Sequence, residues 1–452
     1  MKRMEQIKPL TEEMLANMAR LIKYNSVQGQ AQPGKPFGEV PAACLAEALQ
    51  IADEMGFETV NMENYCGYAE MGSGKEIIGL CAHLDVVPAG EGWNTDPFTL
   101  TRVGDNVFGR GVSDDKGAVI ASLYAMKLVK ESGVALNKRV RLLMGCNEET
   151  GSRCMAYYAK HGEPITAGFT PDGSFPGIHG EKGACGMLAH SKNTKIISMN
   201  GGFVTNAVCN RCKTEIPADS VDAQKLRAEL SKTALAASTV TEQDGVISID
   251  AQGVSAHAST PQLGVNAAAC TMLALKNAGM EDDFVDFYLS HIGTECDGEG
   301  IGCKFADKYG ALTLNNGIVK TENGEITCTI DIRYPVTLNP EKMRAMAEGH
   351  LEDEKGRIEI LSIGEPLFYP EDSALVQNLL HAYQEVTGDM EHQPEVIGGG
   401  TYAKHVPGII AFGCEFPGED NHIHDANEIL AIESLQKQVD IYVEAILNLL
   451  KA

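Results

Sequence analysis

An imidazole and a carboxylate lie two positions apart at the end of an apolar run. Residues 77–81 are typical of a buried strand, and His83 and Asp85 follow them, before Pro88. Side chains two positions apart on a strand point to the same side. His83 and Asp85 therefore share one face and should act on a common target.

Four further polar clusters occur at expected strand ends or tight turns. In chain order they contain Asp114 with Asp115, Glu148 with Glu149, Asp172 after Pro171, and His424 near His422. In α/β sheets, functional sites gather beyond the carboxyl ends of the strands. We therefore expect one edge of a sheet to bring together five side chains: His83, Asp114, Glu149, Asp172 and His424.

The electrostatics of such a cluster predict a pair of metal ions. Three carboxylates in one cleft repel each other and lose hydration, and two divalent cations with a hydroxide would balance them. Mixed imidazole and carboxylate ligands favour Zn²⁺, with Co²⁺ or Mn²⁺ as substitutes, in a hydrolytic pair of ions. Asp85 fits the place of a carboxylate that orients a ligating imidazole. Of the adjacent Glu148 and Glu149, one could bind metal while the other takes a proton from water.

Each cluster also has a purely structural interpretation. Asp114 and Asp115 could cap the helix that follows, the two glutamates could form a solvated turn, and Asp172 could form an Asx turn. Cys209 and Cys212 form a single CxxC pair, which cannot close a four-cysteine zinc site and which we attribute to chance. The motifs HExxH and GxSxG do not occur in the sequence. Five clusters together favour the metal site.

The composition excludes several classes of partner. The chain has 452 residues, of which 44% are hydrophobic and 22% are charged, as in ordinary globular proteins with two or three domains. A net charge of -25 argues against nucleic acids and anionic membranes as partners. We see no signal peptide and no membrane-spanning run, and the thirteen scattered cysteines suit a reducing compartment. We therefore expect a cytoplasmic protein.

Helical and strand patterns alternate in the first and last parts of the chain. Expected helices cover 11–23, with Thr11 as the N-cap, 40–55 and 117–132, and expected strands cover 77–81 and 139–144. Apolar residues at 435, 439, 442, 446 and 449 predict a helix at the end of the sequence. The alternation predicts an α/β fold with a mixed, largely parallel sheet flanked by helices.

The middle of the chain has a different pattern. Strand-like segments occur at 246–252, 310–319, 325–335 and 356–363, and helical stretches occur near 222–236 and 340–352. We interpret residues 186–371 as an inserted α+β domain. Residues 1–185 and 372–452 would then form the two parts of one discontinuous domain.

Taken in order, the motifs resemble those of a known family. HxDxVP at 83–88, GxxDDKG at 111–117, EETG at 148–151, TPDG at 170–173 and HxxNE at 424–428 are similar to the motif set of the di-zinc aminoacylase/succinyl-diaminopimelate desuccinylase family of peptidases. Longer stretches such as AHLDVVPAGEGWNTDPF and GGGTYAKHVPG favour its dipeptidase branch, typified by peptidase V, a carnosinase-like Xaa-His dipeptidase. The likeness covers nearly the whole chain.

The resemblance implies an activity and a role for each matching residue. The activity would be hydrolysis of a dipeptide by a zinc-activated water molecule. Glu148 would be the general base and Asp85 the orienting carboxylate. His83 and Asp172 would hold one zinc ion, Glu149 and His424 the other, and Asp114 would bridge the two.

The same resemblance makes the inserted domain a lid that carries substrate-binding groups. His257 in GVSAHASTP would stabilise the oxyanion, Asn206 in GGFVTN would contact the substrate, and Arg333 in DIRYP would bind its C-terminal carboxylate. Cys209 replaces a proline that often follows the lid asparagine in the family. The long lid favours a monomer that acts on small peptides, with a homodimer as the alternative.

Two other functions remain open from the sequence alone. One is an N-acyl-amino-acid deacylase of the same family. The other is a catalytically inactive protein that binds metal or a partner on the same scaffold. The presence of Glu148 argues against the inactive protein, because metal ligation alone does not need that residue.

Overall fold

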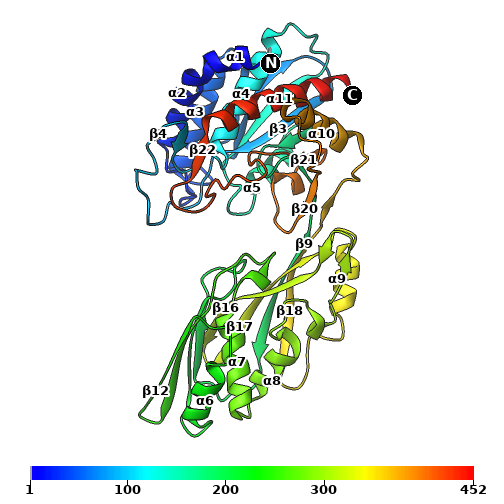
Figure 1. Cartoon of the computed structure of the whole chain (residues 1–452). Coiled ribbons are helices and arrows are strands. Elements are labelled where there is room, and N and C mark those ends of the chain that lie inside the picture. The colour runs from blue at the N-terminus through cyan, green and yellow to red at the C-terminus, as the bar shows by residue number, and fades with distance from the viewer. Residues whose placement is uncertain (1–2) are drawn as a thin grey trace. The chain divides into compact units, whose positions relative to one another are not determined.

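The computed structural model describes residues 3–452 (Figure 1). The chain forms two compact units. Unit 1 comprises Met1–Gly180, Phe368–Glu395 and Gly400–Ala452, and unit 2 comprises Glu181–Leu367 and Val396–Gly399. Domain limits at 185/186 and 371/372 stay predictions, since the compact units divide at slightly different positions.

Unit 1 is built on a nine-stranded mixed sheet. Its spatial order is β1 (Glu58–Met62), β2 (Cys66–Gly72), β6 (Arg139–Gly145), β3 (Ile77–His83), β7 (Ala167–Thr170), β21 (Ile409–Ala411), β8 (Ile178–Glu181) and β19 (Leu367–Phe368), and β20 (Glu395–Ile397) pairs with β8. The central strands β6, β3, β7 and β21 run parallel. His83 pairs with Gly145 in the register, so β3 and β6 end at the same edge of the sheet. The two strands predicted here are confirmed.

Helices of unit 1 pack on this sheet. They are α1 (Met4–Ile7), α2 (Thr11–Ile22), α3 (Glu39–Glu54), α4 (Lys116–Glu131), α5 (Arg153–His161), α10 (Ala374–Thr387) and α11 (Ile432–Lys451), with the short 3₁₀ turns η1 (Lys8–Leu10) and η5 (Tyr402–Lys404). Helices α4 and α11 contact each other and strand β3 (Figure 1). The stripe predicted for the last helix is buried at all five positions: Leu435, Val439, Tyr442, Ile446 and Leu449. The predicted α/β architecture with flanking helices is confirmed.

The predicted N-cap role of Thr11 is wrong. Helix α2 follows η1 without a break, and the Thr11 N–H already donates to the Lys8 carbonyl oxygen. Leu10 occupies the N-cap position with helical backbone angles and no capping bond. Thr11 instead accepts a hydrogen bond of 2.7 Å at Oγ1 from Gln436 Nε2 of α11. The preceding turn makes a side-chain cap unnecessary.

A small sheet joins opposite ends of the sequence. Its strands are β4 (Thr101–Val103), β5 (Asn106–Phe108) and β22 (Ile429–Ala431), and β22 pairs with β5 in antiparallel register. The Gly109 N–H extends this pairing to the Glu428 carbonyl oxygen, at 3.2 Å. The loop that carries Asp114 therefore lies next to the loop that carries His424.

Unit 2 contains an eight-stranded antiparallel sheet. Its order is β12 (Ala237–Gln243), β13 (Val246–Gln252), β11 (Arg211–Pro217), β10 (Ser198–Gly201), β16 (Thr313–Glu322), β17 (Glu325–Tyr334), β9 (Gly183–Ser191) and β18 (Gly356–Gly364), with a separate hairpin of β14 (Ala306–Asp307) and β15 (Gly310–Ala311). Alternate residues of β17 are buried, which is typical of a sheet with one face in the core. The strand-like segments predicted in this region are confirmed.

The helical segments of unit 2 are α6 (Ala223–Leu230), α7 (Ala267–Ala278), α8 (Asp283–Phe287), α9 (Pro340–Ala347), the 3₁₀ turns η2 (Pro261–Leu263) and η4 (Glu299–Ile301), and the π-helical η3 (Tyr288–Ile292). Helix α7 packs on β11 and β13. The helix expected near 222–236 is shorter than predicted, and α7 was not predicted. Within residues 3–452, no helix has the length and apolar character that a membrane crossing requires.

Candidate metal centre

His83 is the last residue of the buried strand β3. Its imidazole is only 1% exposed, and Nδ1 lies 3.0 Å from the main-chain oxygen of Asp85. A carbonyl oxygen can only accept, so Nδ1 carries the proton in this contact. In the neutral ring, Nε2 is then the unprotonated nitrogen that can ligate a metal. This Nε2 lies 2.8 Å from Asp114 Oδ1.

The carboxylate of Asp85 has a different contact from the one we predicted. It lies 3.6 Å from His83 Nδ1, beyond hydrogen-bond distance, while the Asp85 carbonyl oxygen fixes the ring. Its two oxygens accept the N–H groups of Glu148 at 2.9 Å and Glu149 at 3.1 Å. Asp85 therefore orients the imidazole with its main chain and the Glu148–Glu149 turn with its side chain.

Asp114 lies between two imidazoles. Its Oδ1 is 2.8 Å from His83 Nε2, and its Oδ2 is 2.9 Å from His424 Nε2. Burial by itself would raise the pKa of Asp114, but the hydrogen bonds from His424 and His83 hold the pKa below its usual range. Asp114 does not cap α4, because no side-chain capping bond is formed at that helix end. Asp115 occupies the N-cap position of α4 without a capping bond either, so neither aspartate caps this helix with its side chain.

The neighbouring Asp115 has a supporting contact. Its Oδ2 accepts the main-chain N–H of His83 at 3.0 Å. Among the described residues, the groups of side chains close enough to share a metal ion include Asp114 but not Asp115. Asp115 therefore fixes the end of β3 and leaves Asp114 as the side chain that faces the imidazoles.

Glu428 holds the Asp114 loop from behind and was not predicted as a functional residue. Its buried carboxylate accepts the N–H groups of Gly111 at 2.9 Å, Ser113 at 2.9 Å and Asp114 at 3.0 Å. It also pairs with Arg110 Nη1 at 2.7 Å, and both side chains are at most 1% exposed. The sequence did contain a signal, since Glu428 is the last residue of HxxNE.

The remaining predicted ligands lie around the same imidazoles. His424 Nε2 is 3.2 Å from Glu149 Oε2, and His83 Nε2 is 3.9 Å from Asp172 Oδ2. Two groups have ligand atoms within 4.8 Å of one another: His83 with Asp114 and Glu149, and His83 with Glu148 and Asp172. Glu149 Oε1 is buried and has no hydrogen-bond partner within residues 3–452. All five side chains that we predicted to converge lie in one cluster.

The protonation behaviour of the cluster indicates an excess of negative charge. Hydrogen bonds to Asp114 and Glu149 raise the pKa of His424 to about 11, against the opposing effect of burial. Burial, followed by the charge of Asp172, raises the pKa of Glu148 well above its usual value. Buried carboxylates around two imidazoles are the donor set that a divalent cation would stabilise. The residues therefore fit the metal site that the sequence predicts.

The three residues predicted to bind substrate lie in unit 2. Asn206 and His257 are exposed, and the Ala258 N–H donates to the Asn206 carbonyl oxygen at 2.8 Å. Arg333 pairs with Asp331 through Nε at 2.7 Å and donates from Nη1 to the Gly398 carbonyl oxygen at 3.2 Å. Thr313, opposite Arg333 in the sheet register, donates to the Ala258 carbonyl oxygen at 3.1 Å. A short chain of contacts thus connects all three residues within this unit.

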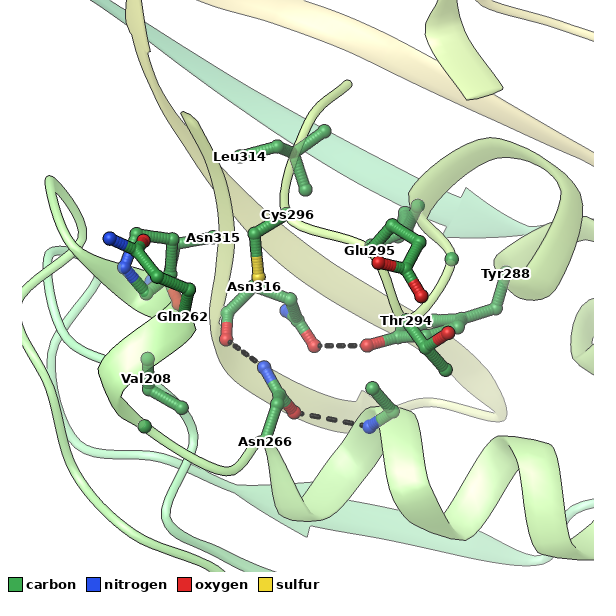
Figure 2. A pocket seen from close by; sticks show the side chains of 15 residues that line it. Val208, Gln262, Asn266, Tyr288, Thr294, Glu295, Cys296, Leu314, Asn315 and Asn316 are labelled. Atoms are coloured by element: carbon green, nitrogen blue, oxygen red, sulfur yellow. Dashed lines mark hydrogen bonds between the residues drawn. The ribbon is translucent and has the colours of Figure 1, made fainter. Parts of the chain in front are cut away.

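A cavity of about 250 Å³ lies in unit 2, and its lining includes Val208, Asn266 and Asn315 (Figure 2). Asn315 lines it and donates from Nδ2 to the carbonyl oxygens of Thr205 at 3.2 Å and Ala207 at 3.0 Å. Figure 2 also shows Asn316 between Asn266, which donates to its carbonyl oxygen, and Tyr288, which donates to its Oδ1. The two bonds from Asn315 therefore anchor the main chain on either side of Asn206.

Solved structures with this fold include two dipeptidases. Human carnosine dipeptidase 1 has a TM-score of 0.60 and 15% identity, over 100% of this chain and 98% of that one. The dipeptidase Dug1p from Saccharomyces cerevisiae has a TM-score of 0.55 and 16% identity, over 99% of this chain and 98% of that one. These likenesses confirm the fold of a sheet domain with an inserted second domain.

Sequence comparison gives the family. The profile described as Peptidase family M20/M25/M40 matches residues 79–448. The Bacillus subtilis (strain 168) protein named "Putative dipeptidase YtjP" is 32% identical over 459 residues, which cover 97% of this chain and 98% of the relative. "Putative dipeptidase SH1171" of Staphylococcus haemolyticus is 30% identical, with 98% of both chains covered. The chain belongs to peptidase family M20/M25/M40, and the predicted family is confirmed.

Proposed function

We propose that this protein hydrolyses dipeptides with the help of two zinc ions held by unit 1. The observation that carries the proposal is the position of Asp114, whose two oxygens lie 2.8 Å and 2.9 Å from the Nε2 atoms of His83 and His424. A carboxylate with one oxygen toward each of two ligating imidazoles has the arrangement of a bridging ligand. The names of the full-length relatives support dipeptides as the substrate class.

The proposed ligand set follows from the cluster. Carboxylates and unprotonated imidazoles suit Zn²⁺, and Mn²⁺ or Co²⁺ could replace it. When bound, the metals would supply Lewis-acid polarisation of the scissile carbonyl group and of a water molecule. His83 and Asp172 would bind one ion, Glu149 and His424 the other, and Asp114 both.

Glu148 is the proposed general base. The Asp85 carboxylate holds its main-chain N–H at 2.9 Å, which fixes the turn that presents the side chain. Burial, followed by the charge of Asp172, raises the pKa of Glu148, which makes its carboxylate a stronger base. Glu148 would then deliver this proton to the leaving amine.

The residues of unit 2 are proposed to bind the substrate. His257 would donate a hydrogen bond to the developing oxyanion, and Asn206 would contact the same substrate. Asp331 orients the Arg333 guanidinium through two hydrogen bonds, and this guanidinium would bind the C-terminal carboxylate. The long inserted domain supports action as a monomer, and the free cysteines support a cytoplasmic location.

A substrate panel with a metal control tests the proposal. The purified protein should cleave Ala-Ala and β-Ala-His, lose this activity after treatment with a chelator, and regain it when Zn²⁺, Mn²⁺ or Co²⁺ is added. N-acetyl-alanine should be cleaved far more slowly. Faster cleavage of N-acetyl-alanine than of Ala-Ala would instead identify a deacylase. A metal-loaded protein that cleaves none of these compounds would contradict the enzymatic proposal.

A further inference from the structure

We propose that Glu415 recognises the free amino group of the substrate and so makes the site selective for dipeptides over N-acylated amino acids. This inference rests on the proposed function. It concerns a residue that has no role in the ligand set or in the proton transfer described above.

The main chain of Glu415 is fixed beside the proposed ligand Asp172. The N–H groups of Cys414 and Glu415 donate to the Gly173 carbonyl oxygen at 2.9 Å and 3.1 Å, and the Phe175 N–H donates to the Glu415 carbonyl oxygen at 2.8 Å. Ser174 and Glu415 form an isolated parallel bridge. The segment after β21 and the segment after β7 thus hold Glu415 next to the metal centre.

The Glu415 carboxylate is a partly buried charge without a partner. No side chain or main-chain N–H within residues 3–452 forms a hydrogen bond or an ion pair with it. Burial first, and then the nearby charge of Asp114, raise the pKa of Glu415, while the charge of His424 opposes this rise. The hydrogen bond from the Glu415 N–H to the Gly173 carbonyl oxygen places this residue beside the proposed ligand Asp172. An unpaired, partly buried carboxylate is unfavourable unless a cation reaches it.

The other buried acids near the centre have defined structural contacts. Asp85 holds the Glu148–Glu149 turn, Asp115 holds the main chain of His83, and Glu428 holds the Asp114 loop. Glu415 has no such contact. Its charge is therefore available to a molecule that enters the site.

A dipeptide would bring a cation to the right neighbourhood. Its ammonium nitrogen lies only about 2.5 Å from the carbon of the scissile carbonyl group, because a single Cα separates them. The three ligand carboxylates would face the metals, whereas Glu415 is outside the ligand set and its charge would pair with the ammonium group. An N-acylated amino acid is neutral at that position, and its binding would leave Glu415 unpaired.

Kinetics with a matched pair of substrates test the inference. Ala-Ala and N-propionyl-alanine differ only in the amino group. Glu415→Gln should lower kcat/KM for Ala-Ala about 10- to 100-fold, because a charge-assisted hydrogen bond is lost, and should leave cleavage of N-propionyl-alanine unchanged or faster. Glu415→Asp, which keeps the charge, should restore part of the Ala-Ala activity. The control Glu12→Gln removes a charge of unit 1 that is 80% exposed and lies outside the centre, and it should change the cleavage of neither substrate.

A binding measurement separates this inference from the proposed function. Binding is measured by calorimetry on the metal-loaded Glu148→Ala protein. In this background, Glu415→Gln should weaken the binding of Ala-Ala about 10- to 100-fold and leave the binding of N-propionyl-alanine unchanged. Equal weakening of both compounds, or no change in either, would overturn the role of Glu415. If the unmutated enzyme cleaves Ala-Ala and only this selectivity is missing, the inference fails while the proposed function stands.

Discussion

Asp114 can face two imidazoles because Glu428 and Asp115 fix the main chain on either side of it. Glu428 accepts the Asp114 N–H, and Asp115 accepts the His83 N–H. Such supporting contacts hold side chains in one geometry before a metal binds. At the scale of single residues, the centre therefore depends on carboxylates that bind main chain as much as on those that face the imidazoles.

Glu148→Ala should separate metal binding from turnover. We expect kcat for Ala-Ala to fall about 100- to 10,000-fold, because a positioned general base contributes that much. Metal analysis should still find two ions per chain, as Glu148 is outside the proposed ligand set. Glu91→Ala, an exposed loop substitution, should change neither quantity. Loss of one ion in Glu148→Ala would make this side chain a ligand and contradict its assignment as the base.

Glu428→Gln should destabilise unit 1. The substitution leaves the Arg110 guanidinium buried without its counter-charge, and breaking a buried ion pair costs about 3–5 kcal/mol. Calorimetry should show a lower melting temperature, and metal analysis should show a lower zinc content. Glu433→Gln is the matched control, because Glu433 pairs with Lys437 at the surface, where ion pairs contribute about 0–1 kcal/mol. A Glu428→Gln protein as stable as this control would refute the supporting role.

At the scale of elements, small residues allow the central strands to approach closely. Gly79 of β3 pairs with Gly168 of β7, and a Cβ on Gly168 would lie 1.8 Å from the Gly79 carbonyl oxygen. The ends of these two strands carry His83 and the Asp172 turn. The spacing of two proposed ligands thus depends on two glycines outside the site.

Gly168→Ala should therefore destabilise the sheet. Overpacking at a position with no space costs about 1–3 kcal/mol, occasionally more, which thermal unfolding would detect. Gly364→Ala in β18 provides the control, since a Cβ there would meet only the Ala184 carbonyl oxygen at 3.8 Å. If both variants unfold at the same temperature, the close approach of β3 and β7 does not limit stability.

Two helices show where local patterns are informative. The apolar stripe of α11 was predicted because apolar residues recur at helical spacing and so lie on one face of the helix. Helix α7 was missed because its sequence, AAACTMLALKNA, is apolar on most faces and has no clear stripe. An all-round apolar helix can only be recognised once the surfaces that bury it are known.

At the scale of the whole molecule, all five proposed ligands belong to unit 1. A metal that binds only the folded state stabilises the part of the protein that holds its ligands. Removal of metal should therefore speed hydrogen exchange at the amides of Leu84, Glu148 and Glu149. Their hydrogen bonds join the segment after β3 to the segment after β6, beside the centre. The β17 amides of Cys328 and Ile330 in unit 2 serve as internal controls and should not change. Equal effects in both units would contradict a centre confined to unit 1.

The sequence by itself determined the fold class, the strands that end at the centre and the five side chains that converge there. Short stretches of sequence determine these features, through the periodicity of apolar residues and through short motifs at strand ends. Ordered motifs also placed the chain in its family. The contacts that each motif residue makes are not determined by the residues next to it in the sequence.

Only the tertiary structure decided how the parts of the centre contact one another. It assigned the Asp85 carbonyl oxygen to His83 and the Asp85 carboxylate to the Glu148–Glu149 turn, and it placed Glu428 behind Asp114. It also removed the N-cap role of Thr11 and put Glu415 beside Asp172 without a partner. Each of these contacts joins segments far apart in the chain, and their geometry is set by the packing of the sheet and not by neighbours in sequence.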